Sequence, residues 1–179
     1  MEIQTVNTFA AFLRGVMPSG RNAVKMADVR KVLGEHGFSD VRTWIQSGNI
    51  ALRSPDDAPG TARRIHALLH EHLGVDLAVI VKEPRHELQA ILDANPFSGD
   101  DYDIRRVFFT LSNTPLVDTA GLNERDFGED RLCIQPQAAY LYIPGDASRS
   151  KLGNAFLEKQ LGLRLTTRNF NTLSKMTGF

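Results

Sequence analysis

Hydrophobic positions along the chain alternate between short continuous runs and stretches with helical spacing. The segment from Thr5 to Leu13 is rich in β-branched and aromatic residues, which is typical of a buried strand. Apolar residues then recur at helical spacing from Met26 to Leu33, and Gly37 with Phe38 supplies a typical helix end. The chain is therefore expected to open with a strand and a helix.

The next segments predict a hairpin, a second helix and a fourth strand. Val41 to Ile45 and Asn49 to Arg53 read as two strands around Gln46-Ser47-Gly48, where glycine can adopt positive φ. A helical pattern runs from Ile65 to Leu73 and stops at Gly74, and Val75 to Val81 reads as a strand. The resulting order, β-α-β-β-α-β, is that of a ferredoxin-like split βαβ unit.

The rest of the chain predicts the same order again. A linking helix opens at Pro84 and closes before Asn95-Pro96. Strands are expected at Arg106 to Leu111, Arg131 to Gln135, Ala138 to Ile143 and through Thr166. Helices are expected at Asp118 to Leu122, Leu152 to Leu161 and Asn169 to Met176, and Ser150 is expected to cap the second of them. We predict an α+β fold of two ferredoxin-like (βαββαβ) plaits in tandem: residues 1–83, a linking helix and loop at 84–103, and residues 104–179 with a C-terminal helix.

This topology predicts two clusters of polar residues at loops. The first two strands of a split βαβ unit run parallel, so the loop after the first strand and the hairpin after the second emerge at one end of the sheet. The first cluster comprises Arg14, Arg21, Lys25, Gln46, Ser47 and Asn49. The second, at the end where the last strand leaves the second plait, comprises Ser150, Lys151, Thr167, Arg168, Asn169 and Asn171.

These residue types suit recognition of a polar, anionic ligand. Guanidinium groups bind phosphate or carboxylate in a bidentate manner, and amides both donate and accept hydrogen bonds. Lys151, just after the expected Ser150 cap, would be a cation at a helix N-terminus, which is disfavoured without an anion nearby. A purely structural interpretation stays open: Arg14 can pair with a carboxylate, the hairpin can bond to itself, and Thr167 or Asn169 can cap the last helix.

Composition narrows the partners and the compartment. The chain has 179 residues, with 21 Lys and Arg against 21 Asp and Glu, so no net charge favours nucleic acid or an anionic membrane. Its one cysteine, Cys133, excludes an internal disulfide, and the first residues lack the pattern of a signal peptide. No apolar run approaches the roughly 20 residues that span a bilayer. A cytoplasmic protein is expected.

Motifs for defined chemistry are weak. His66 and His70 are four residues apart on a helix, but no third metal ligand follows at diagnostic spacing, so no metal site is predicted. Cys133 lies in an apolar strand, and the acidic loop Asp100, Asp101 and Asp103 lacks the glycine and glutamate of a calcium loop. The chain has no P-loop, nucleophile elbow or dinucleotide fingerprint. No cofactor and no general base can be named, which leaves enzymatic activity open.

Several motifs together resemble a bacterial family catalogued as domain of unknown function 1697. They are Leu13-Arg14-Gly15, Met26 and Leu33 with Gly37-Phe38, Val41-Arg42-Thr43-Trp44-Ile45-Gln46-Ser47-Gly48-Asn49, Asn95-Pro96-Phe97, Ser150-Lys151-Leu152 and Thr166-Thr167-Arg168-Asn169-Phe170-Asn171-Thr172. The resemblance covers nearly the whole chain. It implies two α/β plaits in one chain and no established activity.

The chain departs from that family pattern at two places. Family members usually carry Asn-Val-Gly-Gly-Lys-Asn after the first strand, whereas this chain has Met17-Pro18-Ser19-Gly20-Arg21-Asn22. Ser19 adopts positive φ less freely than glycine, which disfavours a backbone cradle for phosphate, while Arg21 keeps the charge. In the last motif, Phe170 replaces the usual tryptophan and removes an indole donor.

We therefore expect an uncharacterised protein that binds a small anionic or nucleotide-like ligand in a polar cleft between loops. A second hypothesis is RNA binding across an open sheet, with bases stacked on Phe9, Phe12, Phe108 and Phe109, although nucleic acid is the less favoured partner. A third is a protein-interaction module that uses the plait sheets. The ligand and the oligomeric state do not follow from the residues.

Overall fold

The computed structural model describes residues 5–179 and shows a mixed α+β protein. Within these residues it contains two four-stranded antiparallel sheets and five α-helices. The chain divides into two compact units, one formed by the described residues up to His86 together with Met176–Phe179, and one formed by Glu87–Lys175. The prediction of an α+β fold is confirmed.

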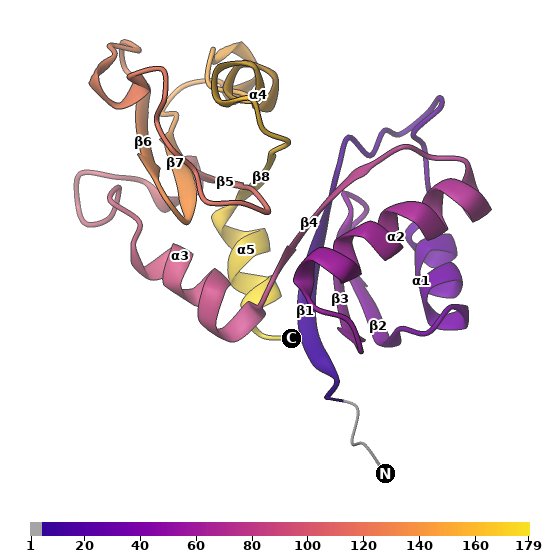
Figure 1. Ribbon diagram of the computed structural model, residues 1–179. Coiled ribbons are helices and arrows are strands. Elements are labelled where there is room, and N and C mark those ends of the chain that lie inside the picture. The colour runs from indigo at the N-terminus through magenta and orange to yellow at the C-terminus, as the bar shows by residue number, and fades with distance from the viewer. Residues whose placement is uncertain (1–4) are drawn as a thin grey trace. The chain divides into compact units, whose positions relative to one another are not determined.

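The first unit has the element order that the hydrophobic pattern predicts. Its sheet has the strand order β2-β3-β1-β4, with antiparallel pairs throughout. Because β1 and β2 both run antiparallel to β3, they run parallel to each other (Figure 1). The elements are β1 (Asn7–Arg14), α1 (Met26–Glu35), β2 (Ser39–Trp44), β3 (Asn49–Ser54), α2 (Ala58–Leu73) and β4 (Ala78–Lys82).

Helices α1 and α2 cover one face of this sheet (Figure 1). Alternate strand residues, such as Leu13 in β1 and Ile50 in β3, join Leu33 of α1 and Ile65 of α2 in one buried core. Burial of such side chains stabilises the unit by about 1.5–3 kcal/mol each. Helix α2 ends at Gly74, whose φ of 68° is the left-handed conformation that the sequence predicts.

The second unit contains a sheet of the same relative order, β6-β7-β5-β8. A π-helical turn (Pro84–Leu88) leads into α3 (Gln89–Asp93), where the linking helix was expected. The other elements are β5 (Val107–Leu111), β6 (Arg131–Gln135), β7 (Ala138–Tyr142), α4 (Asn154–Leu161), β8 (Thr166–Asn169) and α5 (Phe170–Thr177).

Side-chain contacts place helices on both faces of this second sheet. Leu157 of α4 packs in one core with Leu141 of β7. On the other side of the sheet, the Tyr140 hydroxyl donates to Ile91 O of α3 at 2.8 Å, and Phe109 lies against Phe170 of α5 with ring centroids 6.5 Å apart. Tyr140 is fully buried, and burial raises its pKa above the ordinary 10.0.

Two local predictions in the second unit are wrong. The segment expected as a helix at Asp118 to Leu122 forms only a 3₁₀ turn at Leu122–Glu124, because the Asp118 carboxylate accepts from the backbone N–H groups of Leu122 and Asn123 and holds a turn. Ser150 is not the cap of α4, which begins at Asn154 after Gly153.

The hydroxyl of Ser150 instead organises the loop before α4. It donates to Asp130 Oδ2 at 2.7 Å and accepts from Leu152 N at 3.0 Å. Lys151 therefore precedes the helix and does not occupy its first turn, so the electrostatic argument for a nearby anion no longer applies to it.

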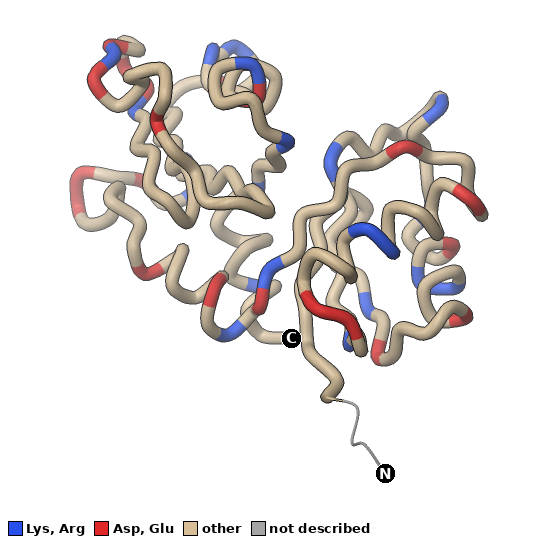
Figure 2. Tube along the Cα trace, viewed as in Figure 1, with Lys and Arg blue, Asp and Glu red and all other residues tan. Residues whose placement is uncertain are grey.

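No helix within residues 5–179 is both long and apolar enough to cross a membrane. Basic and acidic residues are interspersed along both units (Figure 2), in keeping with the equal numbers of the two charges in the sequence.

Candidate functional site

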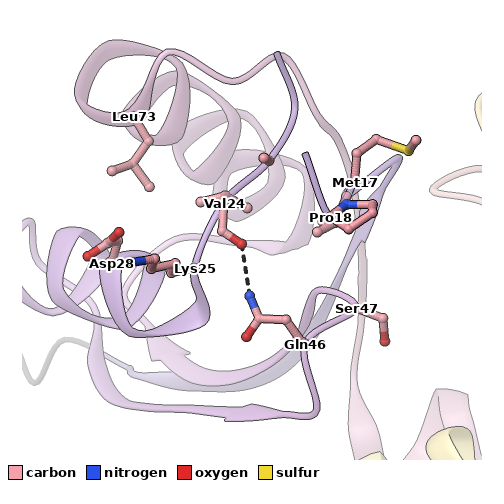
Figure 3. Close-up of a pocket in the computed structure, with 10 residues that line it drawn as sticks. Met17, Pro18, Val24, Lys25, Asp28, Gln46, Ser47 and Leu73 are labelled. Atoms are coloured by element: carbon pink, nitrogen blue, oxygen red, sulfur yellow. Dashed lines mark hydrogen bonds between the residues drawn. The ribbon is translucent and has the colours of Figure 1, made fainter. Parts of the chain in front are cut away.

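A pocket of about 780 Å³ lies in the first unit, where the loop after β1 meets the turn between β2 and β3 (Figure 3). This is the meeting of loops that the parallel course of β1 and β2 predicts. The volume falls within the range of about 300–1,000 Å³ common for small-molecule sites. The pocket is lined by Val16, Met17, Pro18, Ala23, Val24, Lys25, Asp28, Gln46, Ser47 and Leu73.

The loop after β1 is held in shape by its own backbone. Met17 N donates to Asn22 O at 3.0 Å, and Ala23 N donates to Gly20 O at 3.2 Å. The Asn22 side chain accepts from Asp76 N at 3.1 Å, which ties the loop to the segment between α2 and β4. The pocket wall is therefore preformed, which lowers the entropy that a ligand must overcome on binding.

The hairpin turn forms the opposite wall and is braced by Asn49. Asn49 is fully buried, and its Nδ2 donates to Trp44 O at 3.1 Å and to Ser47 Oγ at 3.0 Å. Gln46 Nε2 reaches across the pocket to Val24 O at 2.9 Å (Figure 3). The two walls are thus joined by a hydrogen bond.

The turn also contains an unusual backbone conformation. Ile45 has a φ of 49°, although it is β-branched, and the residue is 54% exposed. A residue of this type in the left-handed region stores about 1–3 kcal/mol of strain. The strain lies directly before Gln46, at the edge of the pocket, which is where functional sites often hold such conformations.

Three polar side-chain groups that line the pocket form no hydrogen bond or ion pair with other described residues. The side chains of Lys25 and Asp28 make no hydrogen bond or ion pair with any residue in the described range 5–179, and the same is true of Gln46 Oε1. Lys25 occupies the N-cap position of α1 in an extended conformation, and its side chain does not cap the helix. The pocket thus offers one cation, one anion and one amide acceptor beside the apolar wall of Val16, Val24 and Leu73.

The structure places half of the first predicted cluster at the pocket. Lys25, Gln46 and Ser47 line it, whereas Arg14, Arg21 and Asn49 do not. Arg14 ends β1 and is half-buried, and Arg21 is exposed in the loop. Asn49 serves the turn, so its contribution to a site would be to position Ser47 and not to contact a ligand.

Four residues of the second predicted cluster, namely Ser150, Thr167, Arg168 and Asn169, form side-chain hydrogen bonds within their own unit. Thr167 Oγ1 donates to Asn154 Oδ1 at 2.7 Å and lies 2.7 Å from the hydroxyl of Thr110. Arg168 Nη1 donates to Thr167 O at 3.0 Å, and Asn169 Oδ1 accepts from Thr172 N at 2.9 Å and caps α5. The structural interpretation of Asn169 is thus seen directly in the contacts. The remaining members, Ser150, Lys151 and Asn171, are not among the residues that line the first-unit pocket.

Sequence reasoning missed the acidic and apolar members of the pocket. Asp28 and Leu73 belong to α1 and α2 and carried no motif. Asp28 lies three residues after Lys25, so the helical spacing of this pair was the signal that could have found it.

Three of the four aromatic residues proposed for RNA stacking are buried. Phe9, Phe12 and Phe109 are 6%, 0% and 0% exposed, and Phe108 packs against the core below α4. Base stacking needs an exposed ring face, which Phe9, Phe12 and Phe109 do not offer.

The histidines and the cysteine have ordinary surroundings. His66 Nδ1 lies 2.8 Å from Leu77 O, and His70 Nδ1 lies 3.3 Å from Val75 O. In the described part of the chain, no three His, Cys, Asp or Glu side chains gather in a way that could hold a metal ion. Cys133 is half-buried, and Gln135 Nε2 donates to its sulfur at 3.6 Å.

The fold and the pocket define an α+β protein with two antiparallel sheets and a loop-bounded site in the first unit. The chain belongs to the family described as "Protein of unknown function (DUF1697)", which matches residues 6–140. It is also similar to a solved structure of a conserved bacterial protein from Streptococcus pneumoniae, with 21% sequence identity, a TM-score of 0.75, and coverage of 97% of this chain and 98% of that one. At this identity the likeness concerns the fold. No curated protein matches the chain.

Proposed function

We propose that the first unit binds a small nucleotide-like ligand with an anionic group in the pocket between the β1 loop and the β2–β3 turn. The observation that carries the proposal is the set of unused polar groups on Lys25, Asp28 and Gln46 beside an apolar wall. Small-molecule sites combine a mostly apolar lining with a few convergent polar groups in this way.

Each group has a distinct role in the proposed complex. The Lys25 ammonium pairs with the phosphate or carboxylate of the ligand. Gln46 Oε1 and the Asp28 carboxylate accept from amino or hydroxyl groups, since both are pure acceptors in this arrangement. Val16, Val24 and Leu73 supply the surface for a planar ring. Arg21, exposed in the β1 loop, adds long-range attraction for an anion.

A titration of the full chain with adenosine monophosphate and adenosine tests the proposal. In ¹H–¹⁵N spectra, the backbone amides of residues 16–25 other than Pro18, and of residues 46–47, should shift with the nucleotide. Lys25→Gln should weaken the nucleotide at least about tenfold, because a charge-assisted contact contributes about 1.5–3 kcal/mol. The same variant should leave the weaker affinity for adenosine unchanged.

Lys31→Gln is the matched control, since Lys31 is an exposed lysine of the same helix that does not line the pocket. The proposal fails if no mononucleotide of a panel with all common bases shifts these amides, or if both lysine variants respond alike.

A protein-interaction module is the second candidate function, and exposed apolar side chains near the pocket favour it. Met17, Trp44 and Ile45 are 53%, 37% and 54% exposed. A mass that rises with concentration in light scattering, and that Trp44→Ser returns to the monomer value, would support this function in place of ligand binding.

The architecture that carries these functions is proposed to be two ferredoxin-like plaits in tandem in a cytoplasmic protein. The equivalent strand orders β2-β3-β1-β4 and β6-β7-β5-β8 support it. The proposed division is residues 1–83, a linking segment at 84–103, and residues 104–179. In the second plait, the loop with the 3₁₀ turn at Leu122–Glu124 would stand where the first plait has α1.

A further inference from the structure

A second pocket in the first unit, of about 600 Å³, lies where β1 begins. It brings together Arg42 of β2, Arg53 of β3, and Arg85 and His86 from the turn after β4. Arg42 belongs to the family motif Val41–Asn49, whereas Arg53, Arg85 and His86 belong to no motif, and none of the four is in a cluster that the sequence predicts. Three guanidinium groups from three separate segments therefore converge on one hollow.

The sheet geometry explains why two of these arginines meet. Arg42 pairs directly with Ala51 across the β2–β3 ladder, and Arg53 is two residues further along β3. Residues at this spacing share a face of the sheet. Because Ile50 and Leu52 point into the core under the helices, Arg42 and Arg53 lie on the opposite face.

The acidic side chains that line the pocket, Asp40 and Glu83, already have partners within the first unit. Asp40 pairs with Arg42 at 3.2 Å. The carboxylate oxygens of Glu83 accept from the backbone N–H groups of Arg85 at 3.1 Å and His86 at 2.6 Å, so they fix the turn after β4. Glu83 keeps its negative charge while it accepts these bonds, but the two acidic side chains of the lining stand against three arginines, so neutralisation of the arginines by side chains of the lining is incomplete.

Arg53 and Arg85 keep their charges unpaired. Both are exposed, and neither side chain forms an ion pair or hydrogen bond with any residue in the part of the chain that the structure describes. Two exposed guanidinium groups in one pocket are not needed for packing of the core. Their mutual repulsion disfavours the arrangement unless an anion binds between them.

We infer that this basic pocket, lined by Arg42, Arg53 and Arg85, is an anion site for a small ligand with two adjacent oxyanion groups. Arg53 and Arg85 form bidentate hydrogen bonds to the ligand. Arg42, which forms an ion pair with Asp40, adds a third positive charge beside them. Diphosphates and dicarboxylates share this chemistry. The pocket volume suits a metabolite of that size.

The basic pocket is independent of the site of the proposed function. It adjoins residues 6–9 at the start of β1, whereas the other pocket adjoins residues 16–18 after the end of the strand. The strand β1 has 8 residues, so roughly 25 Å of extended chain separates the two ends. No residue lines both pockets.

Isothermal titration of the full chain with inorganic pyrophosphate, and separately with malonate, tests the inference. We expect one of the two anions to bind, and Arg53→Gln with Arg85→Gln to raise its Kd at least about tenfold. The matched control is Lys31→Gln with Arg63→Gln, which removes the same charge from exposed residues of α1 and α2 and should leave the Kd within about twofold.

The two anions distinguish a phosphorylated from a carboxylated ligand. Lys25→Gln should not change the affinity of either, which separates this result from the test of the nucleotide site. The inference is overturned if neither anion binds, if both double variants weaken binding equally, or if only a short single-stranded RNA binds to the wild-type chain.

Discussion

Replacing Gly48 with alanine perturbs the contact between the hairpin turn and β1 that forms the first pocket. Gly48 has a φ of 86°, and a Cβ at this position would lie 2.7 Å from Leu13 Cβ and 3.1 Å from Val16 Cγ2. Leu13 is 1% exposed and its Cβ is fixed by the backbone of β1, so the turn itself has to move.

The expected destabilisation has two parts. A residue with a Cβ in the left-handed region costs about 1–2 kcal/mol. Overpacking against a rigid strand costs about 1–3 kcal/mol more. We expect the free energy of unfolding of the first unit to fall by about 3 kcal/mol in total. The movement would also weaken the bond from Leu13 N to Gly48 O, which is 2.8 Å long, and would carry Gln46 away from Val24.

Urea denaturation followed by tryptophan fluorescence measures this effect in the first unit alone. Trp44, in β2, is the one tryptophan of the sequence, so its emission reports the unfolding of that sheet. Gly20→Ala is the control: Gly20 has a φ of 88° but no atom lies within 4 Å of its Cβ position, so only the backbone cost of about 1–2 kcal/mol applies. Equal losses in the two variants would refute the role of the contact with β1.

Other substitutions test the remaining local arguments. Ile45→Gly should raise the stability of the first unit by about 0.5–1 kcal/mol through release of strain, and a loss in urea denaturation would contradict the strained conformation. Asn169→Ala should cost about 1 kcal/mol by removing the cap of α5, while Asn169→Asp keeps the acceptor; circular dichroism of thermal unfolding should separate the two variants. Tyr140→Phe should cost about 1–2 kcal/mol by leaving Ile91 O without its donor. Burial raises the pKa of Tyr140 in the folded protein, so the neutral phenol stabilises the fold fully below the unfolded pKa of about 10, and this stabilisation is lost as pH rises through the folded pKa. An absorbance titration should therefore show one of the 3 tyrosines ionising at higher pH than the others. This step should be absent in Tyr140→Phe.

Most of the element order could be predicted from local patterns. The alternation of apolar residues and the glycines at helix ends are properties of neighbouring residues, and they placed β6 at its observed bounds and α1 at its first residue. The meeting of the β1 loop with the β2–β3 turn also followed, because the predicted topology requires parallel first and second strands.

The role of each polar side chain could not be predicted in the same way. The sequence pattern of an asparagine in a turn is the same whether its side chain contacts a ligand or stabilises the turn. Only the full burial of Asn49 decides between these two roles. Ser150 looked like a helix cap because the residue type fits, but its bond to Asp130, 20 residues earlier, fixes it in the loop.

The sequence by itself determined the α+β class, most of the order of strands and helices, and the family, since these depend on periodicity and on residues adjacent in the chain. Only the tertiary structure decided which charged side chains gather at one pocket. Lys25 and Asp28 beside Gln46, and Arg42 beside Arg53 and Arg85, come together through strand pairing and packing. Ion pairs and hydrogen bonds act over a few ångströms in space, and separation along the chain does not reveal that distance.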